Sequence, residues 1–404
     1  MMTKSRVSRA MRQRAVCLAA TGGLCLSSAV FAQSAVEIYG RANLGLDNWS
    51  ALGATAGSAQ DYKSRMRVYD NRSRIGFRGN EDLGGGLRAI FQIESGVSID
   101  SGSGNGQDGT ANASSGFLAS RDSYAGLAGN WGAFRLGRQT IYQPNGTNEQ
   151  TDLNYVNTGV PYFQGLFGRI ARPATRQSNV AQYLSPDWNG FAVALAYAPN
   201  SETAAAGQPT DGKIWNVKVT YKGPINIQVD YSKNISQSAA TGPTIPGTRT
   251  GLKASIAWSY APAAQITLLL ANQKRGSASA VAGFTAAGDN VNQNMWGLNW
   301  EHTFGNIQAL AQYGTLNKIS GCTESAGAVA GIGGSTCAAT ESTSYLIGAR
   351  YLFSKRTAVY TTYMRVLNRA NQNSDSSAAG YSSASSLPAG ADPTVWALGI
   401  VHNF

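Results

Sequence analysis

Long apolar segments are missing from most of this chain. After its first 32 residues, the 404-residue sequence has no run of 18 consecutive apolar residues, which excludes membrane-spanning helices in that part. Charge is also scarce, since Asp, Glu, Lys and Arg make up only 14% of the chain. Apolar residues alternate with polar ones along many segments. If the chain is exported, as its first residues indicate below, the protein classes that remain are a secreted all-β protein and a transmembrane barrel.

Export is indicated by the first 32 residues. They contain no acidic residue, and an apolar stretch from Ala15 to Val30 leads to Val30-Phe31-Ala32. The basic residues that precede this stretch are Lys4, Arg6, Arg9, Arg12 and Arg14. We expect residues 1–32 to be a signal peptide removed after Ala32, leaving 33–404 as one domain. An N-terminal membrane anchor is the alternative, but polar residues and glycines interrupt the short apolar stretch.

Cysteine is rare in the remaining 372 residues (404 − 32), where only Cys322 and Cys337 occur. In an oxidising compartment these two have one possible intramolecular pairing, a disulfide that would pin a surface loop. Two free thiols are the alternative. The residues between them show no metal-ligand pattern, and we expect no metal or cofactor anywhere in the chain. The net charge of these residues is +6 (28 − 22). Their basic side chains are scattered among the predicted strands and form no concentrated patch, so we expect no nucleic-acid partner.

Alternating segments bounded by turn residues predict sixteen strands, an even number, with fourteen or eighteen as the alternatives. Their expected ranges are 35–47, 72–79, 86–95, 121–128, 133–139, 178–185, 191–198, 213–221, 225–233, 252–260, 265–274, 293–303, 307–316, 342–352, 356–366 and 394–404. Short turns alternate with long connections rich in Gly, Ser, Ala and Asn. The predicted fold is an all-β, sixteen-stranded antiparallel transmembrane barrel with short periplasmic turns and long extracellular loops.

The two faces of the predicted strands differ in character. The first strand places Val36, Ile38 and Leu44 on one face and Glu37 and Arg41 on the other. The same alternation places three further arginines on the polar inner face, namely Arg74, Arg78 and Arg88. A barrel this wide with a polar inner face is expected to hold water. Aromatic residues suited to the lipid interface are Tyr260, Trp296, Trp300, Tyr351, Tyr360, Tyr363 and Trp396.

The last predicted strand can close the barrel. It places Trp396, Leu398, Ile400 and Phe404 on one face, as expected for a strand that lies against lipid. With sixteen strands it can pair antiparallel with the first strand and remove the last open edge.

Several segments resemble the trimeric general porins of Gram-negative outer membranes. They are Val36-Glu-Ile-Tyr-Gly-Arg-Ala-Asn-Leu-Gly-Leu46, the stretch 73–94 with its Glu-Asp-Leu-Gly, Leu136-Gly-Arg-Gln139 and the ending His402-Asn-Phe404. The resemblance implies a homotrimeric outer-membrane channel for small hydrophilic solutes, in contact with lipid and lipopolysaccharide. It also implies that the terminal Phe404 is read by the outer-membrane assembly machinery.

The resemblance further implies that the third long loop, 140–177, folds inward and narrows the pore. Its acidic residues Glu149 and Asp152 would then face arginines of the wall. By position the wall candidates are Arg74, Arg121 and Arg138, and alternation adds Arg41, Arg78 and Arg88. The alternation of side chains along its strand places Arg138 on the outer face. Any of these arginines could instead solvate a loop or contact lipopolysaccharide. An excess of arginine at the narrowest point predicts a weak to moderate anion preference.

Two alternatives remain open. Aromatic residues in the inward loop, Tyr142, Tyr155, Tyr162, Phe163 and Phe167, leave room for a channel specific for a sugar, phosphate or an organic acid, or they could fix the loop to the wall. A barrel enzyme is disfavoured, because His302 and His402 both fall on the apolar face of their strands and no nucleophile with a base can be assigned.

Overall fold

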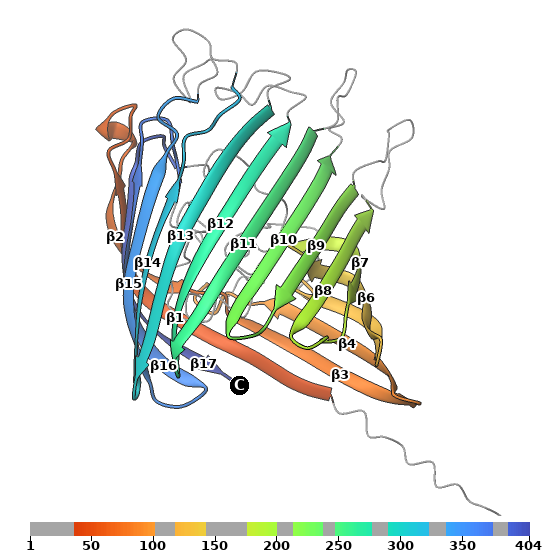
Figure 1. Cartoon of the computed structure of the whole chain (residues 1–404). Coiled ribbons are helices and arrows are strands. Elements are labelled where there is room, and N and C mark those ends of the chain that lie inside the picture. The colour runs from red at the N-terminus through yellow and green to blue at the C-terminus, as the bar shows by residue number, and fades with distance from the viewer. Residues whose placement is uncertain are drawn as a thin grey trace, which may run out of the picture. The chain divides into compact units, whose positions relative to one another are not determined.

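Strands make up nearly all of the regular structure of this chain (Figure 1). The computed structural model describes residues 36–101, 118–142, 176–199, 213–236, 247–276, 290–322, 337–374 and 387–404. The strands are β1 (Val36–Leu52), β2 (Tyr62–Asp70), β3 (Arg74–Gly84), β4 (Leu87–Gly96), β5 (Ser123–Gly129), β6 (Gly132–Thr140), β7 (Arg176–Leu184), β8 (Phe191–Pro199), β9 (Lys213–Tyr221), β10 (Ile225–Ser236), β11 (Gly247–Ala261), β12 (Ala264–Gly276), β13 (Asn290–Phe304), β14 (Ile307–Leu316), β15 (Ser342–Leu352), β16 (Thr357–Asn368) and β17 (Asp392–Asn403). A short 3-10 helix, η1 (Ser58–Gln60), precedes β2. Among these described residues, no helix is long and apolar enough to cross a membrane.

The strands form one closed antiparallel barrel. Each neighbouring pair is hydrogen-bonded, and β1 pairs with β17 to complete the ring. On its other side β1 pairs with β3 through its first half and with β2 through its second half. The segments β2 and β3 therefore together form a single crossing of the wall, and the seventeen segments make a sixteen-stranded barrel, as the sequence predicted.

The break between β2 and β3 was not foreseen, and β2 was expected to be loop. Leu44 pairs with Asp70 and Arg41 with Arg74, so two residues of β1 face three residues of the interrupted strand. The Asp70 carboxylate accepts a 2.9 Å hydrogen bond from the Ser73 amide, and Arg72 has a φ of 61°. Because β2 contains several charged residues, its alternation of apolar and polar side chains is weak in the sequence. Pairing with the second half of β1 satisfies its backbone and holds it in the wall.

Strand limits elsewhere agree closely with the alternation. The predicted ranges 213–221, 307–316 and 342–352 match β9, β14 and β15, whereas β1 and β11 run five residues nearer the long loops than expected. The strand ends that border the long connections lie at one end of the barrel, here called the long-loop end. The tight connections, such as that between β13 and β14, lie at the other, the short-turn end.

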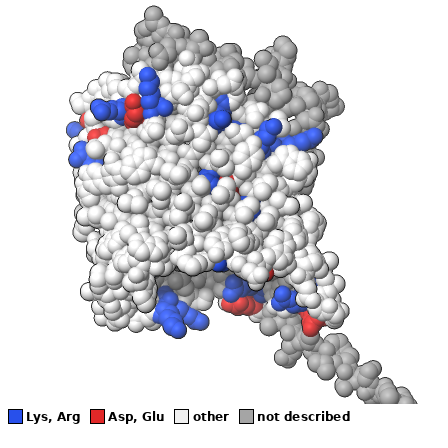
Figure 2. Space-filling view, in the orientation of Figure 1, with Lys and Arg blue, Asp and Glu red and all other residues white. Residues whose placement is uncertain are grey.

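Apolar side chains cover the outside of the wall. On β17 the outward residues Trp396 and Leu398 are 49% and 48% exposed, while the inward Val395 and Ala397 are fully buried. Figure 2 shows the resulting surface: the middle of this face is almost free of charge, and Lys, Arg, Asp and Glu gather near its two ends. A wide uncharged band between charged rims is what a lipid-facing barrel presents.

The inner face is less uniformly polar than predicted. Where β1, β2 and β14 to β17 meet, buried apolar side chains form a cluster on the inside. Its larger members are Trp49, Tyr69, Leu310, Leu346, Met364, Val366, Leu387 and Val395. Tyr360 was expected at the lipid interface, and this was wrong. It points inward, 2% exposed, and its hydroxyl bonds to Asn43 Oδ1 and to the Tyr69 hydroxyl, each at 2.8 Å.

The seam between β1 and β17 depends on glycine. Gly45 and Gly399 pair directly across it, and a Cβ on either residue would overlap the tyrosine ring beside it, Tyr69 or Tyr360 respectively. Two backbone hydrogen bonds between Gly40 and Phe404, of 3.0 and 3.1 Å, extend the seam to the last residue. Phe404 therefore completes the edge of the closing strand, as the sequence predicted.

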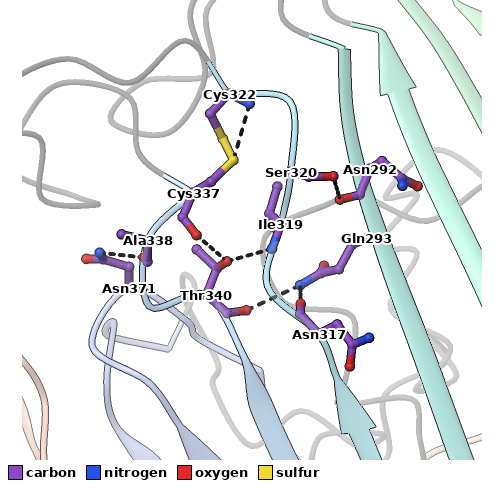
Figure 3. Close-up of a disulfide and its surroundings, with 10 residues drawn as sticks. All are labelled: Asn292, Gln293, Asn317, Ile319, Ser320, Cys322, Cys337, Ala338, Thr340 and Asn371. Atoms are coloured by element: carbon purple, nitrogen blue, oxygen red, sulfur yellow. Dashed lines mark hydrogen bonds between the residues drawn. A yellow bond between two sulfur atoms is a disulfide. The ribbon is translucent and has the colours of Figure 1, made fainter.

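A disulfide joins Cys322 and Cys337 at the long-loop end, as predicted, with their Cα atoms 5.7 Å apart. Next to it, Thr340 connects several segments (Figure 3). Its hydroxyl donates to the Cys337 carbonyl at 2.8 Å and accepts from the Ile319 amide at 2.9 Å. Its own carbonyl accepts from Gln293 of β13. The disulfide thus closes the β14–β15 connection on itself, and Thr340 joins that connection to the start of β13.

Replacing both cysteines with serine is expected to loosen this connection without opening the barrel. A cross-link over a loop of this length stabilises by roughly 3 kcal/mol in the chain-entropy estimate, so cleavage between positions 322 and 337 should become about tenfold faster or more. Limited proteolysis with mass mapping measures this. Thr340→Val, which keeps the disulfide and loses the hydroxyl, is the matched control. Equal cleavage of oxidised and reduced wild-type protein would contradict the prediction.

Candidate functional site

Charged side chains on the inner wall concentrate around Glu94 of β4. Its carboxylate accepts hydrogen bonds from Arg121 Nε at 2.5 Å and from the Tyr39 hydroxyl at 3.1 Å, and Arg74 Nε lies 3.6 Å away. Gly76 of β3 makes this possible, because a Cβ there would overlap the Tyr39 ring. Two of the predicted wall arginines, Arg74 and Arg121, therefore share one acidic partner.

Arg41 of β1 adds a third cation to this group. It lies directly opposite Arg74 in the β1–β3 register, on the same face, and only 4% of it is exposed. Its Nε and Nη2 atoms have no hydrogen-bond partner. Like charges directly opposite each other destabilise a sheet, so this placement concentrates positive charge at a structural cost.

Two other predicted arginines lie nearer the short-turn end. Arg78 makes a paired contact with Glu37, with Nε and Nη2 at 2.8 and 2.9 Å from its two carboxylate oxygens, and its guanidinium lies 5.0 Å from the Tyr39 ring centre. Arg88 lies at the start of β4, beside the tight turn, where it lines a hollow that is also lined by Arg78. The arginines that alternation placed on the inner face thus form two groups, one around Glu94 and one nearer the short-turn end.

Arg138 does not join the inner-face arginines, as the alternation along its strand predicted. It lies at a bulge between β6 and β7, and it donates to the Ser120 carbonyl at 3.0 Å and to the Ser178 hydroxyl at 2.9 Å. Its neighbours Phe134 and Leu136, which share its parity, are 42% and 54% exposed. A role for Arg138 in the pore remains a prediction.

Arg176, at the start of β7, was missed by the sequence reasoning, which assigned it to the loop. Its Nε lies 2.7 Å from Asp122 Oδ1, which also accepts from the Thr140 hydroxyl at 2.8 Å. Asp122 directly follows Arg121. Arg176 therefore adjoins the Glu94 group, and only the pairing of Thr140 with Arg176 across the ends of a long loop reveals it.

The chain that leaves β6 runs along the inside of the wall. Ile141 is fully buried in an apolar cluster with inward residues of β7, β8 and β9. Tyr142 is also fully buried, and its ring lies 5.0 Å from Lys253 Nζ of β11. Lys253 is in turn 3.7 Å from Asp230 of β10. Ile141 and Tyr142 thus lie on the inner side of the wall, and the inward fold expected for the rest of 140–177 stays a prediction.

The remaining predictions for this loop cannot be placed. Glu149 and Asp152, the expected acidic partners of the wall, lie outside the described residues, as do Tyr155, Tyr162, Phe163 and Phe167. Within the described ranges, no group of three His, Cys, Asp or Glu side chains could hold a metal ion. His302 stacks on Phe304 with ring centres 4.0 Å apart, and His402 bonds to the Thr357 hydroxyl. Both histidines are engaged in contacts of their own.

One protein family and several curated proteins are similar to this chain in sequence. The family described as Gram-negative porin matches residues 15–371. The major outer membrane protein P.IB of Neisseria lactamica is 31% identical over 181 residues, which are 44% of this chain and 49% of that protein. Its counterpart in Neisseria meningitidis serogroup B is 29% identical over 219 residues, covering 52% and 59%. The chain therefore spans about half the length of the curated relatives it matches.

Solved structures show the same fold over a larger share of the chain. An anion-selective porin from Comamonas acidovorans aligns with a TM-score of 0.68 at 23% identity, covering 92% of this chain and 100% of that one. OmpT, an outer membrane protein of Vibrio cholerae, aligns with a TM-score of 0.60 at 12% identity, covering 92% and 98%.

Proposed function

Since this chain belongs to the Gram-negative porin family, we propose that it forms a water-filled channel in the outer membrane through which small hydrophilic solutes and ions diffuse passively. The family membership favours a channel over the barrel enzyme considered from the sequence. The short-turn end would then face the periplasm and the long-loop end the exterior.

We propose further that the channel prefers anions. The observation that carries this proposal is the group around Glu94, where Arg41, Arg74 and Arg121 outnumber the single carboxylate (3 − 1 = +2). A fixed positive field over the aqueous path raises the local concentration of anions. The fold relative from Comamonas acidovorans is described as anion-selective, which supports the same assignment. If Glu149 and Asp152 face this group, they temper the preference.

The reversal potential of purified protein in a planar bilayer tests the proposal. With a tenfold KCl gradient, the sign of the potential should correspond to chloride passing more readily than potassium. A potential of the opposite sign would overturn anion preference, and the absence of channel conductance would overturn the channel itself.

Assembly and processing follow the same proposal. We propose that residues 1–32 are removed on export, that 33–404 form a homotrimer in contact with lipid and lipopolysaccharide, and that Phe404 serves as a signal to the assembly machinery. The apolar band of Figure 2 and the position of Phe404 at the seam support these assignments.

A further inference from the structure

A hollow of about 530 Å³ lies on the inner wall between the Glu94 group and the short-turn end. Strands β3 to β7 and the first residues of β1 line it. Its charged residues are Arg78, Arg88, Arg135 and Glu37, which sum to 3 − 1 = +2. The sequence reasoning placed Arg78 and Arg88 in the constriction and did not single out Arg135.

Two of these arginines have no anionic partner. Within the described part of the chain, the Arg88 side chain makes no hydrogen bond and no ion pair, although Arg88 lies opposite Asp82 in the β3–β4 register. The Asp82 carboxylate instead accepts from the Gly84 amide. Arg135 lies over the Tyr124 ring, 4.4 Å from its centre, and its buried Nε has no hydrogen-bond partner. Arg78, by contrast, is neutralised by Glu37.

Apolar side chains lie between these two guanidiniums, and Asn80, Tyr124 and Ser185 also line the hollow. Arg88 is in register with Ala128 of β5, which pairs with Ala133 of β6, and Arg135 follows two residues later on the same face. The two arginines thus belong to strands roughly 10 Å apart. Ile90 and Leu184 also line the hollow. The site therefore has a cation at each end and several apolar side chains between them.

We propose that this hollow is a second anion station, which holds an organic dianion with two carboxylates on a short apolar chain. Each carboxylate would take one guanidinium, because a planar fork of N–H donors matches a carboxylate. The methylenes would lie against Ile90 and Leu184. A solute that passes the Glu94 group would then meet a second attractive site before it reaches the short-turn mouth. This station rests on the proposed channel function, since it needs an aqueous path to fill.

Block of single-channel current by glutarate tests the station. Glutarate has two carboxylates on three methylenes, butyrate has one carboxylate, and inorganic phosphate lacks the chain. In wild-type channels glutarate should block at a concentration about tenfold below that of either comparator, because charged hydrogen bonds at both ends are combined. Arg88→Gln and Arg135→Gln together should raise the blocking concentration of glutarate about tenfold or more and leave that of butyrate within about threefold.

Controls separate this proposal from the proposed function. Lys355→Gln, on an exposed turn at the same end of the barrel, removes one charge outside the hollow and should leave the block unchanged. Arg88→Lys and Arg135→Lys, which keep the charge and lose the fork, should give an intermediate block. An unheated gel confirms that each variant is folded. If the double glutamine variant is blocked as wild type is, the station is overturned, whereas anion preference stands or falls on the wild-type reversal potential.

Discussion

A channel that carries Arg41→Gln, Arg74→Gln and Arg121→Gln is expected to change from anion to cation preference. The native group has a charge of 3 − 1 = +2, and the variant leaves the Glu94 carboxylate alone, at −1. Fixed charges that line a narrow passage set the local concentration of permeant ions. We expect the chloride-to-potassium permeability ratio to fall about tenfold or more, measured as the reversal potential in a KCl gradient.

A charge series on the same residues provides the control. Adding Glu94→Gln to the triple variant brings the group to zero, and the channel should then discriminate weakly. Glu94→Gln alone leaves +3 and should strengthen anion preference. Because the quadruple variant leaves no buried carboxylate without a partner, it also separates electrostatics from misfolding. A triple variant that retains the wild-type permeability ratio would show that selectivity arises elsewhere.

Gly399→Val is expected to keep most molecules from closing the barrel. A Cβ on Gly399 would overlap the ring and hydroxyl of Tyr360 and lie 2.7 Å from the Leu44 carbonyl oxygen. The backbone on both sides of the seam is fixed by β-pairing, so the strain is not easily relieved, and overpacking of this kind costs about 1–3 kcal/mol. The folded fraction on an unheated gel after refolding should fall severalfold. Gly45→Val, which meets Tyr69, should behave alike.

Ala42→Val is the matched control for the seam. Ala42 lies on the outward face of β1, the strand that carries Gly45, where an added side chain meets lipid, and the folded fraction of this variant should equal that of the wild type. If Gly399→Val refolds to the same yield, the glycine pair is not needed for closure.

Deletion of Phe404 separates its two roles. The deletion removes the two hydrogen bonds with Gly40 at the end of the seam, a small loss for purified protein refolded in detergent. If Phe404 is also an assembly signal, insertion in cells should fall far more than refolding in detergent does. Equal losses in the two assays would leave Phe404 with its structural role alone.

The sequence by itself determined the architecture of this protein. Alternation and turn residues gave the sixteen crossings, the inward direction of Glu37 and Arg41 on β1, and the closure of the barrel by the strand that ends at Phe404. These features could be predicted because the side-chain period of a strand is local, and because lipid requires every backbone group to be paired.

Only the tertiary structure decided which side chains meet inside the barrel. Arg41 and Arg74 are 33 residues apart in sequence and lie opposite each other, while the hydroxyls of Tyr69 and Tyr360 are joined across a separation of 291 residues. Alternation assigns a residue to a face but carries no information on its neighbours across the sheet, which depend on register. For this reason the partner of Arg176 and the unpaired Arg135 became visible only once the barrel was closed.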